Sequence, residues 1–203
     1  QKALADRRGP IIPFIAETGG LNAMIADSSA LPEQIVRDAV RSAFDSAGQR
    51  CSAARVLFLQ DDIAAKTIPM LTGAIAALKI GDPLAIDTDI GPVIDEPSQD
   101  ALETHKLRMQ DQARELIDLR LPPNVRGGTY VSPACYEIDR MSLLDREVFG
   151  PILHVVRFPR GGLSKVIDSI NASGYGLTLG LHSRIEAVAD QVARQARVGN
   201  LYV

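Results

Sequence analysis

Hydrophobic and polar positions follow two different patterns along this chain. Between Pro32 and Gly48 the apolar side chains recur three and four residues apart and form one wide stripe, which predicts an amphipathic helix. A proline and an acid open this segment and a glycine closes it, as is typical of helix ends. By contrast, residues 11–16 form a short, continuous apolar run between glycine-containing turns, which indicates a buried strand.

The two patterns repeat to the end of the sequence and predict an alternation of strands and helices. The segment 98–119 differs in character, because its mixed charges favour a helix on the surface. Strands that alternate with helices imply an α/β fold, with a mainly parallel sheet flanked by helices. The expected strands are 11–16, 21–26, 53–60, 127–131, 135–138, 152–158, 177–182 and 200–203, and the expected helices are 32–47, 61–79, 98–119, 163–172 and 185–197.

The composition is that of an ordinary globular domain. Hydrophobic residues make up 46% of the 203 and charged residues 23%, which is enough for one substantial core. A net charge of −3 gives no electrostatic reason to expect a nucleic acid or membrane partner. No apolar run reaches the ~20 residues of a membrane-spanning helix. The two cysteines and three histidines lack the spacing of a disulfide framework or a metal site, so we expect neither.

Cys51 is the first residue with candidate chemistry, because it lies where the 32–47 helix gives way to the 53–60 strand. A thiol at such a joint lies at the end of rigid elements, where it can face a cleft and attack a carbonyl carbon. Glu17 ends the first apolar run, before two glycines, and is a candidate general base. Each has an ordinary alternative: Cys51 as a small buried hydrophobe, and Glu17 as a surface acid at a strand end.

Glu147 and Phe149 form a second candidate pair, in a turn that Gly150 and Pro151 close. A carboxylate can accept two hydrogen bonds from the hydroxyls of a ribose, and an aromatic ring can pack on a sugar or a nicotinamide. Turns of this composition are common, so the sequence alone leaves a ligand-binding role and a purely structural role both open.

Taken in order, these and similar segments resemble the aldehyde dehydrogenase superfamily across nearly the whole chain. Residues 17–23 resemble the branch that oxidises glutamate semialdehyde, and residues 28–34 and 42–48 resemble the dehydrogenase part of the bacterial bifunctional proline utilisation A enzymes. The matching pieces are Glu17-Thr18-Gly19-Gly20, Gly48-Gln49-Arg50-Cys51, Gly81-Asp82-Pro83 with Gly91-Pro92, Glu147-Val148-Phe149-Gly150-Pro151, and Tyr175-Gly176-Leu177.

The resemblance implies NAD-dependent oxidation of glutamate 5-semialdehyde, derived from 1-pyrroline-5-carboxylate, to glutamate in proline catabolism. Cys51 would form a thiohemiacetal with the aldehyde, and loss of hydride to NAD would leave a thioester that Glu17 helps water to hydrolyse. The Cys51 backbone N–H would supply half of the oxyanion site. Glu147 would hold the nicotinamide ribose with Phe149 beside it, and Ser52 would touch the substrate carboxylate.

The resemblance also implies a division of the chain. Residues 1–20 would be the last piece of a missing NAD-binding domain, and residues 21–203 the catalytic, cysteine-bearing domain, truncated at its C-terminus. We therefore expect a fragment that does not turn over alone. Its parent would be a cytoplasmic bacterial homo-oligomer, a dimer, that acts on a small aldehyde and carries FAD in a separate domain.

Three alternatives stand beside this interpretation. The first is an NAD-dependent dehydrogenase for another aldehyde, because part of the substrate pocket would lie outside the sequence. The second is an inactive α/β assembly module in which Cys51 is inert. The third is a cysteine hydrolase, which would need a histidine close to Cys51 in space.

Overall fold

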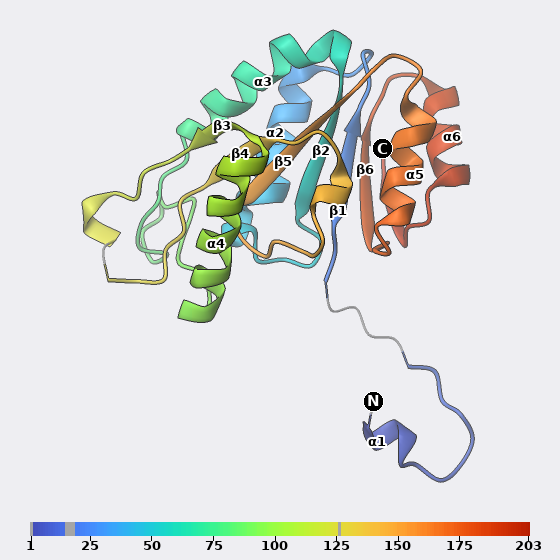
Figure 1. The fold of residues 1–203 in the computed structure, drawn as a ribbon, viewed down its shortest axis with the longest axis horizontal. Helices are drawn as coiled ribbons and strands as arrows, with labels where there is room; N and C mark the ends of the chain where they lie inside the picture. Colours follow the sequence, from blue (N-terminus) through green and yellow to red (C-terminus); the bar gives the residue numbers. More distant parts are fainter. Residues whose placement is uncertain (1, 15–18, 126) are drawn as a thin grey trace.

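The computed structural model describes residues 2–14, 19–125 and 127–203, and within them seven strands form one sheet (Figure 1). The strands lie side by side in the order β3-β4-β5-β2-β1-β6-β7. They are β1 (Asn22–Ala26), β2 (Ala54–Gln60), β3 (Arg114–Asp118), β4 (Ala134–Glu137), β5 (Ile152–Phe158), β6 (Thr178–His182) and β7 (Asn200–Tyr202). The α-helices are α1 (Lys2–Ala5), α2 (Pro32–Phe44), α3 (Asp61–Ala76), α4 (Glu96–Gln112), α5 (Leu163–Ala172) and α6 (Glu186–Gln195), with 3₁₀ turns η1 (Asp45–Gly48), η2 (Pro123–Val125) and η3 (Met141–Leu143).

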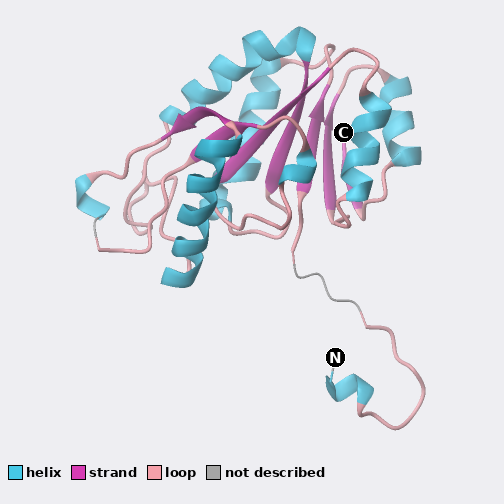
Figure 2. Cartoon of the chain, viewed as in Figure 1, coloured by secondary structure: helices cyan, strands magenta, loops and turns pink. Residues whose placement is uncertain are grey.

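The sheet is parallel throughout except where β3 and β4 pair antiparallel. The predicted α/β fold with a mainly parallel sheet is therefore confirmed. The chain moves along the sheet in one direction through α2 and α3 and in the other through α5 and α6. Because crossovers between parallel strands are right-handed, the first pair of helices covers one face and the second pair the other. Figure 2 shows the strands as a central layer between these helices.

The core lies along the middle of the sheet. All seven residues of β2 and all five of β1 are buried, as expected of strands covered on both faces. The predicted apolar stripe of α2 faces this core, with Ile35, Ala39 and Phe44 almost fully buried. The predicted strand 152–158 and helix 163–172 match β5 and α5 in both of their ends.

The strand predicted at 11–16 is wrong over residues 11–14, which form no strand and are exposed, Ile11 completely. Residues 15 and 16 lie outside the described residues. A strand needs a partner for its backbone hydrogen bonds. The neighbouring strand β1 has no free side to offer, because β2 and β6 already occupy both of its edges.

Four other predictions need correction. The helix predicted over 98–119 ends at Gln112, and residues 114–118 form the edge strand β3, in which Ile117 lies opposite Cys135. Charged, half-exposed edge strands resemble surface helices in composition, so only the pairing with β4 distinguishes them. Residues 127–131 form a loop, bound to Val93 through Thr129. The helices predicted to reach 47 and 79 end at Phe44 and Ala76, where 3₁₀ and turn geometry take over.

Candidate active site

The candidate residues gather at the amino ends of the parallel strands. Cys51 precedes β2, the Glu147 turn precedes β5, and Asn22 opens β1. Cys51 is exposed, on a turn that follows two residues with left-handed backbone, Ser46 (φ 58°) and Ala47 (φ 53°). Such a conformation costs an L-residue roughly 1–2 kcal/mol, so tertiary contacts must hold the turn before the thiol in place.

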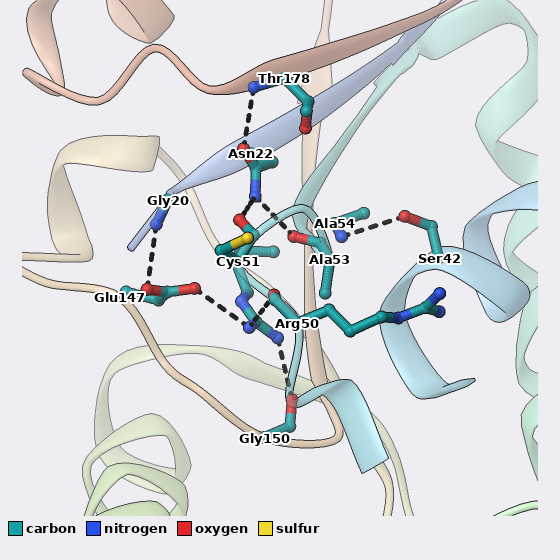
Figure 3. A network of polar contacts seen from close by, with 11 residues as sticks. Gly20, Asn22, Ser42, Arg50, Cys51, Ala53, Ala54, Glu147, Gly150 and Thr178 are labelled. Atoms are coloured by element: carbon teal, nitrogen blue, oxygen red, sulfur yellow. Dashed lines mark hydrogen bonds and ion pairs between the residues drawn. The ribbon is translucent and has the colours of Figure 1, made fainter. Parts of the chain in front are cut away.

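Asn22 fixes the carbonyl side of Cys51. Its side-chain amide donates to the Cys51 carbonyl oxygen at 2.6 Å and to the Ala53 carbonyl oxygen at 3.0 Å. The Asn22 carboxamide oxygen accepts the backbone N–H of Thr178 at 3.1 Å. Figure 3 shows Asn22 between the Cys51 turn and Thr178, so one buried side chain ties the thiol-bearing turn to the start of β6.

Arg55, one residue inside β2, joins the two candidate turns. Its guanidinium is fully buried and donates to the Glu147 carboxylate at 3.1 Å, to the Gly150 carbonyl at 3.2 Å and to the Arg50 carbonyl at 3.2 Å. Burial lowers the pKa of Arg55, and the carboxylate of Glu147 acts most strongly against that shift, with a smaller contribution from Cys51. The Phe149 ring covers the guanidinium, with 5.3 Å between the Arg55 Cζ and the ring centroid.

Glu147 also reaches the end of the segment that carries Glu17. Its Oε2 atom accepts the backbone N–H of Gly20 at 2.9 Å. A Cβ atom at Gly20 would lie 2.8 Å from the Cys51 carbonyl oxygen, so glycine is required for this close approach. The predicted base Glu17 lies outside the described residues. Gly20, three residues later, thus lies against both the Cys51 turn and Glu147.

Ser52 faces a different space from Glu147 and Phe149. It is exposed and lines a cavity of about 650 Å³ together with Arg41, Ser42 and Arg50. Glu147 and Phe149 line a second cavity of about 260 Å³. The two cavities share no lining residue. Each has two arginines and one carboxylate on its wall, Arg41, Arg50 and Asp38 in the first and Arg108, Arg146 and Glu147 in the second.

The three histidines are engaged elsewhere. His105 and His154 are buried and hydrogen-bond through their Nε2 atoms at 2.9 Å, while His182 lies 3.7 Å from Asp38. Burial lowers the pKa of His105 to about 4 and that of His154 to about 3, helped by Arg108 in the first case and by the partner histidine in the second. The described contacts give Cys51 no histidine partner, so the cysteine hydrolase alternative lacks its base.

Sequence reasoning missed Asn22 and Arg55. A signal existed for Arg55, because it is a charged residue inside an otherwise apolar strand run, where an unpaired cation is costly. Asn22 carried no comparable signal, since a polar residue at a strand start is unremarkable. The other cysteine, Cys135, is fully buried, and burial raises the pKa of its thiol.

Sequence comparison places this arrangement in a family. A sequence model described as the aldehyde dehydrogenase family matches residues 1–203. The chain belongs to this family. Two relatives of this aldehyde dehydrogenase chain are the bifunctional PutA proteins of Salmonella typhimurium and Escherichia coli. Each is 52% identical over 203 residues, with 98% of the chain and 15% of the relative covered.

Solved structures of aldehyde dehydrogenases agree with this assignment. A crystal structure of bifunctional proline utilization A superposes with a TM-score of 0.93 at 50% identity, over all of this chain and 20% of that one. A 1-pyrroline-5-carboxylate dehydrogenase structure gives a TM-score of 0.83 at 28% identity, over 92% and 36%. The expected resemblance to the proline utilisation A enzymes is confirmed, although the chain spans only 15% of the length of the PutA proteins named above.

Two negative findings apply to the described part of this aldehyde dehydrogenase chain. Over residues 2–14, 19–125 and 127–203, no group of three or more histidine, cysteine or acidic side chains is arranged to hold a metal ion. In the same ranges, the helices are too short or too polar to cross a membrane.

Proposed function

We propose that this chain supplies the nucleophile, Cys51, with which a longer protein oxidises an aldehyde through a covalent bond, with NAD as the acceptor of the hydride. The observation that supports this proposal best is the exposed Cys51 thiol, on a turn that Arg55 ties directly to Glu147. The thiol attacks the aldehyde carbon to give a thiohemiacetal, and oxidation of that adduct leaves a thioester on Cys51. Glu17 then takes a proton from the water that releases the acid.

The residues around Glu147 fit the ribose of a nicotinamide cofactor. Among the described residues, each Glu147 oxygen has one hydrogen-bond partner, Arg55 on Oε1 and Gly20 on Oε2, and a carboxylate has about four acceptor positions in total. Its side chain is 11% exposed at the cavity that the Phe149 ring also lines. Glu147 thus keeps acceptor capacity for ribose hydroxyls, and Phe149 offers a face beside them.

Glutamate 5-semialdehyde is the substrate that we propose. Its carboxylate needs donors at some distance from the aldehyde carbon, and Ser52 supplies a hydroxyl beside the nucleophile. Arg41 and Arg50 line the same cavity, where both also lie near Asp45, at 3.7 Å and 3.6 Å, and Asp38 is on the same wall. The names of the relatives at 52% and 28% identity, PutA and 1-pyrroline-5-carboxylate dehydrogenase, support the same substrate.

The remaining parts of the proposal concern the longer protein. Residues 1–20 would end the NAD-binding domain and residues 21–203 would belong to the catalytic domain, so the chain would need the rest of the longer protein to turn over. The longer protein would be a bifunctional bacterial enzyme of the cytoplasm, a homo-oligomer with FAD in another domain. The chain covers only 15% of each PutA protein, which supports the proposal of a longer protein.

Selective thiol labelling tests the central assignment. Iodoacetamide should modify Cys51 quickly and spare Cys135, which is buried in the same chain and so serves as an internal control. In the longer protein, Cys51→Ala should abolish semialdehyde oxidation and leave NAD binding intact, while Glu17→Gln should slow thioester hydrolysis more than hydride transfer. Full oxidation activity in the Cys51→Ala protein would refute the mechanism, whereas equally slow labelling of Cys51 and Cys135 would favour the inert assembly module.

A further inference from the structure

The peptide unit that precedes Cys51 is held by its carbonyl oxygen. That oxygen belongs to Arg50 and accepts two hydrogen bonds, from the Arg55 guanidinium at 3.2 Å and from the Ala53 backbone N–H at 3.0 Å. The N–H of the same peptide unit is the N–H of Cys51. Whatever orients the Arg50 carbonyl therefore also orients the Cys51 N–H, because the peptide is planar.

Arg50 itself does not supply the cation at this turn. Its side chain is directed to the end of α2, where it donates to the Arg41 carbonyl at 3.2 Å and lies 3.6 Å from Asp45. Figure 3 shows the Arg50 side chain extending away from Glu147. The buried cation of the site is thus Arg55, although Arg50 is the closer neighbour in sequence.

Burial of Arg55 is costly and only partly compensated. The side chain is 0% exposed, and its Nε atom finds no hydrogen-bond partner among the described residues. An apolar residue of similar volume often packs in such a position without loss of stability. A fully buried arginine with an unsatisfied donor is therefore better explained by what its other two nitrogens hold than by its contribution to folding.

We propose that Arg55 is a positioning residue for the reaction at Cys51, because its guanidinium fixes the peptide that carries the Cys51 N–H and fixes Glu147 in the same contact. The proposal rests on the proposed function of Cys51 as the nucleophile. A charge-assisted bond to the Arg50 carbonyl also polarises the peptide, which strengthens its N–H as a donor by roughly 10–30%. The N–H is then already aligned for the oxygen that becomes negative when the thiol attacks.

Two reagents separate this effect from simple access to the thiol. In acylation by p-nitrophenyl acetate, the Cys51 thiolate attacks the carbonyl carbon, a C–S bond forms, and the electron pair of the broken C–O bond leaves with p-nitrophenolate. That reaction passes through an oxyanion. Alkylation by iodoacetamide displaces iodide from a saturated carbon and forms no oxyanion. Neither reaction needs NAD, so both can be measured on the 203-residue chain, with Cys51→Ala as the blank.

Arg55→Lys and Arg55→Met are the test variants. Loss of an oxyanion donor costs about 10²–10³-fold in rate, and Arg55 acts on that donor indirectly, so we expect acylation to slow about tenfold. Alkylation should stay within about threefold of the unaltered chain. Arg157→Met is the matched control, because Arg157 also lies on a strand and pairs with an acid, Asp61 at 2.9 Å, but is 43% exposed. It should change neither rate.

The outcomes are distinct. The positioning role would be overturned if acylation and alkylation slow equally in Arg55→Lys and Arg55→Met. It would also be overturned if neither reaction slows in these variants. Thermal unfolding of each variant shows whether it is folded. If Arg55→Met does not fold, Arg55→Lys, which keeps the positive charge, still provides the test. If the unaltered chain is alkylated but not acylated at Cys51, the positioning role is refuted while the nucleophile remains. If neither reagent reacts at Cys51, the proposed function fails as well.

Discussion

The side-chain amide of Asn22 donates to the carbonyl oxygen of Cys51 at 2.6 Å, across 29 residues of sequence. Together with the bond from Arg55 to the Arg50 carbonyl, it fixes the two peptide units on either side of the Cys51 Cα. A thiol held in this way has few backbone orientations, so its direction is set before any substrate arrives.

Replacing Asn22 by alanine should therefore destabilise the fold as well as loosen the turn. The change leaves the Cys51 carbonyl and the Thr178 N–H without their partner, which costs about 1–3 kcal/mol for buried groups. Urea unfolding measures the loss. Asn171→Ala is the control, because Asn171 also bonds two backbone groups, of Gln195 and Arg197, in an exposed place. Equal losses in the two variants would contradict the special role of Asn22.

The buried histidine pair predicts a pH dependence of stability. In the unfolded chain both histidines titrate near pH 6.5, whereas burial holds the pKa of His105 at about 4 and that of His154 at about 3. As the pH falls below about 6.5, the unfolded chain therefore takes up protons that the folded chain does not. The free energy of unfolding should decrease by up to about 1.4 kcal/mol per pH unit for each histidine.

Charged residues near the histidine pair also shift the pKa of His105. Arg108 and Arg146 lower the pKa of His105, and Asp145 raises it. Urea unfolding between about pH 7.5 and pH 5 measures the slope before most carboxylates titrate. The His105→Gln variant should show a smaller slope than the unaltered chain, because one of the two shifted groups is gone. An unchanged slope in this variant would exclude the histidine pair as the cause.

Gly48→Ala should be the most damaging glycine substitution near the site. Gly48 has φ +68°, and a Cβ atom there would lie 2.6 Å from the Gly150 carbonyl carbon. The left-handed backbone alone costs roughly 1–2 kcal/mol, and displacement of the Glu147 turn adds about as much again. Gly161→Ala isolates the first effect, because Gly161 has φ +79° and open space around it. Circular dichroism during thermal unfolding compares the two, and equal shifts would refute the clash.

Lys106 should be worth more to stability than a surface lysine. Its ammonium group is buried between the Asp118 carboxylate at 2.8 Å and the Ser132 hydroxyl at 2.5 Å. Lys106→Met strands a largely buried carboxylate, so we expect a loss of about 3 kcal/mol. Lys79→Met breaks the exposed pair with Asp87 and should cost less than about 1 kcal/mol. A small loss in Lys106→Met on urea unfolding would show that Asp118 is solvated instead.

The sequence predicted the interior of the fold better than its edges. Both ends of β5 and of α5 were predicted correctly, because a strand buried on both faces and an amphipathic helix carry strong signals in the pattern of apolar residues. The edge strand β3 was mistaken for helix because its half-exposed residues have no such period. Pairing with β4 decides its conformation, and that partner lies well separated in sequence.

The sequence predicted those residues of the site that belong to local motifs. Cys51, Glu147 and Phe149 come together around one buried arginine. The residues that hold them, Asn22 and Arg55, act across 29 and 92 positions of sequence. A local pattern cannot contain such contacts, because they exist only once β1, β2 and β5 lie side by side.

The pairing of β2 with β5 places Val56 opposite His154, and the two turns that enter these strands bear Cys51 and Glu147. Sliding β5 by one residue would displace its turn by roughly 3.3 Å and invert every side chain of the strand. The backbone hydrogen bonds between β2 and β5 therefore set the distance between the turn that bears Cys51 and the turn that bears Glu147. The distance between the reactive groups thus depends on how the buried strands β2 and β5 pair in the interior of the protein.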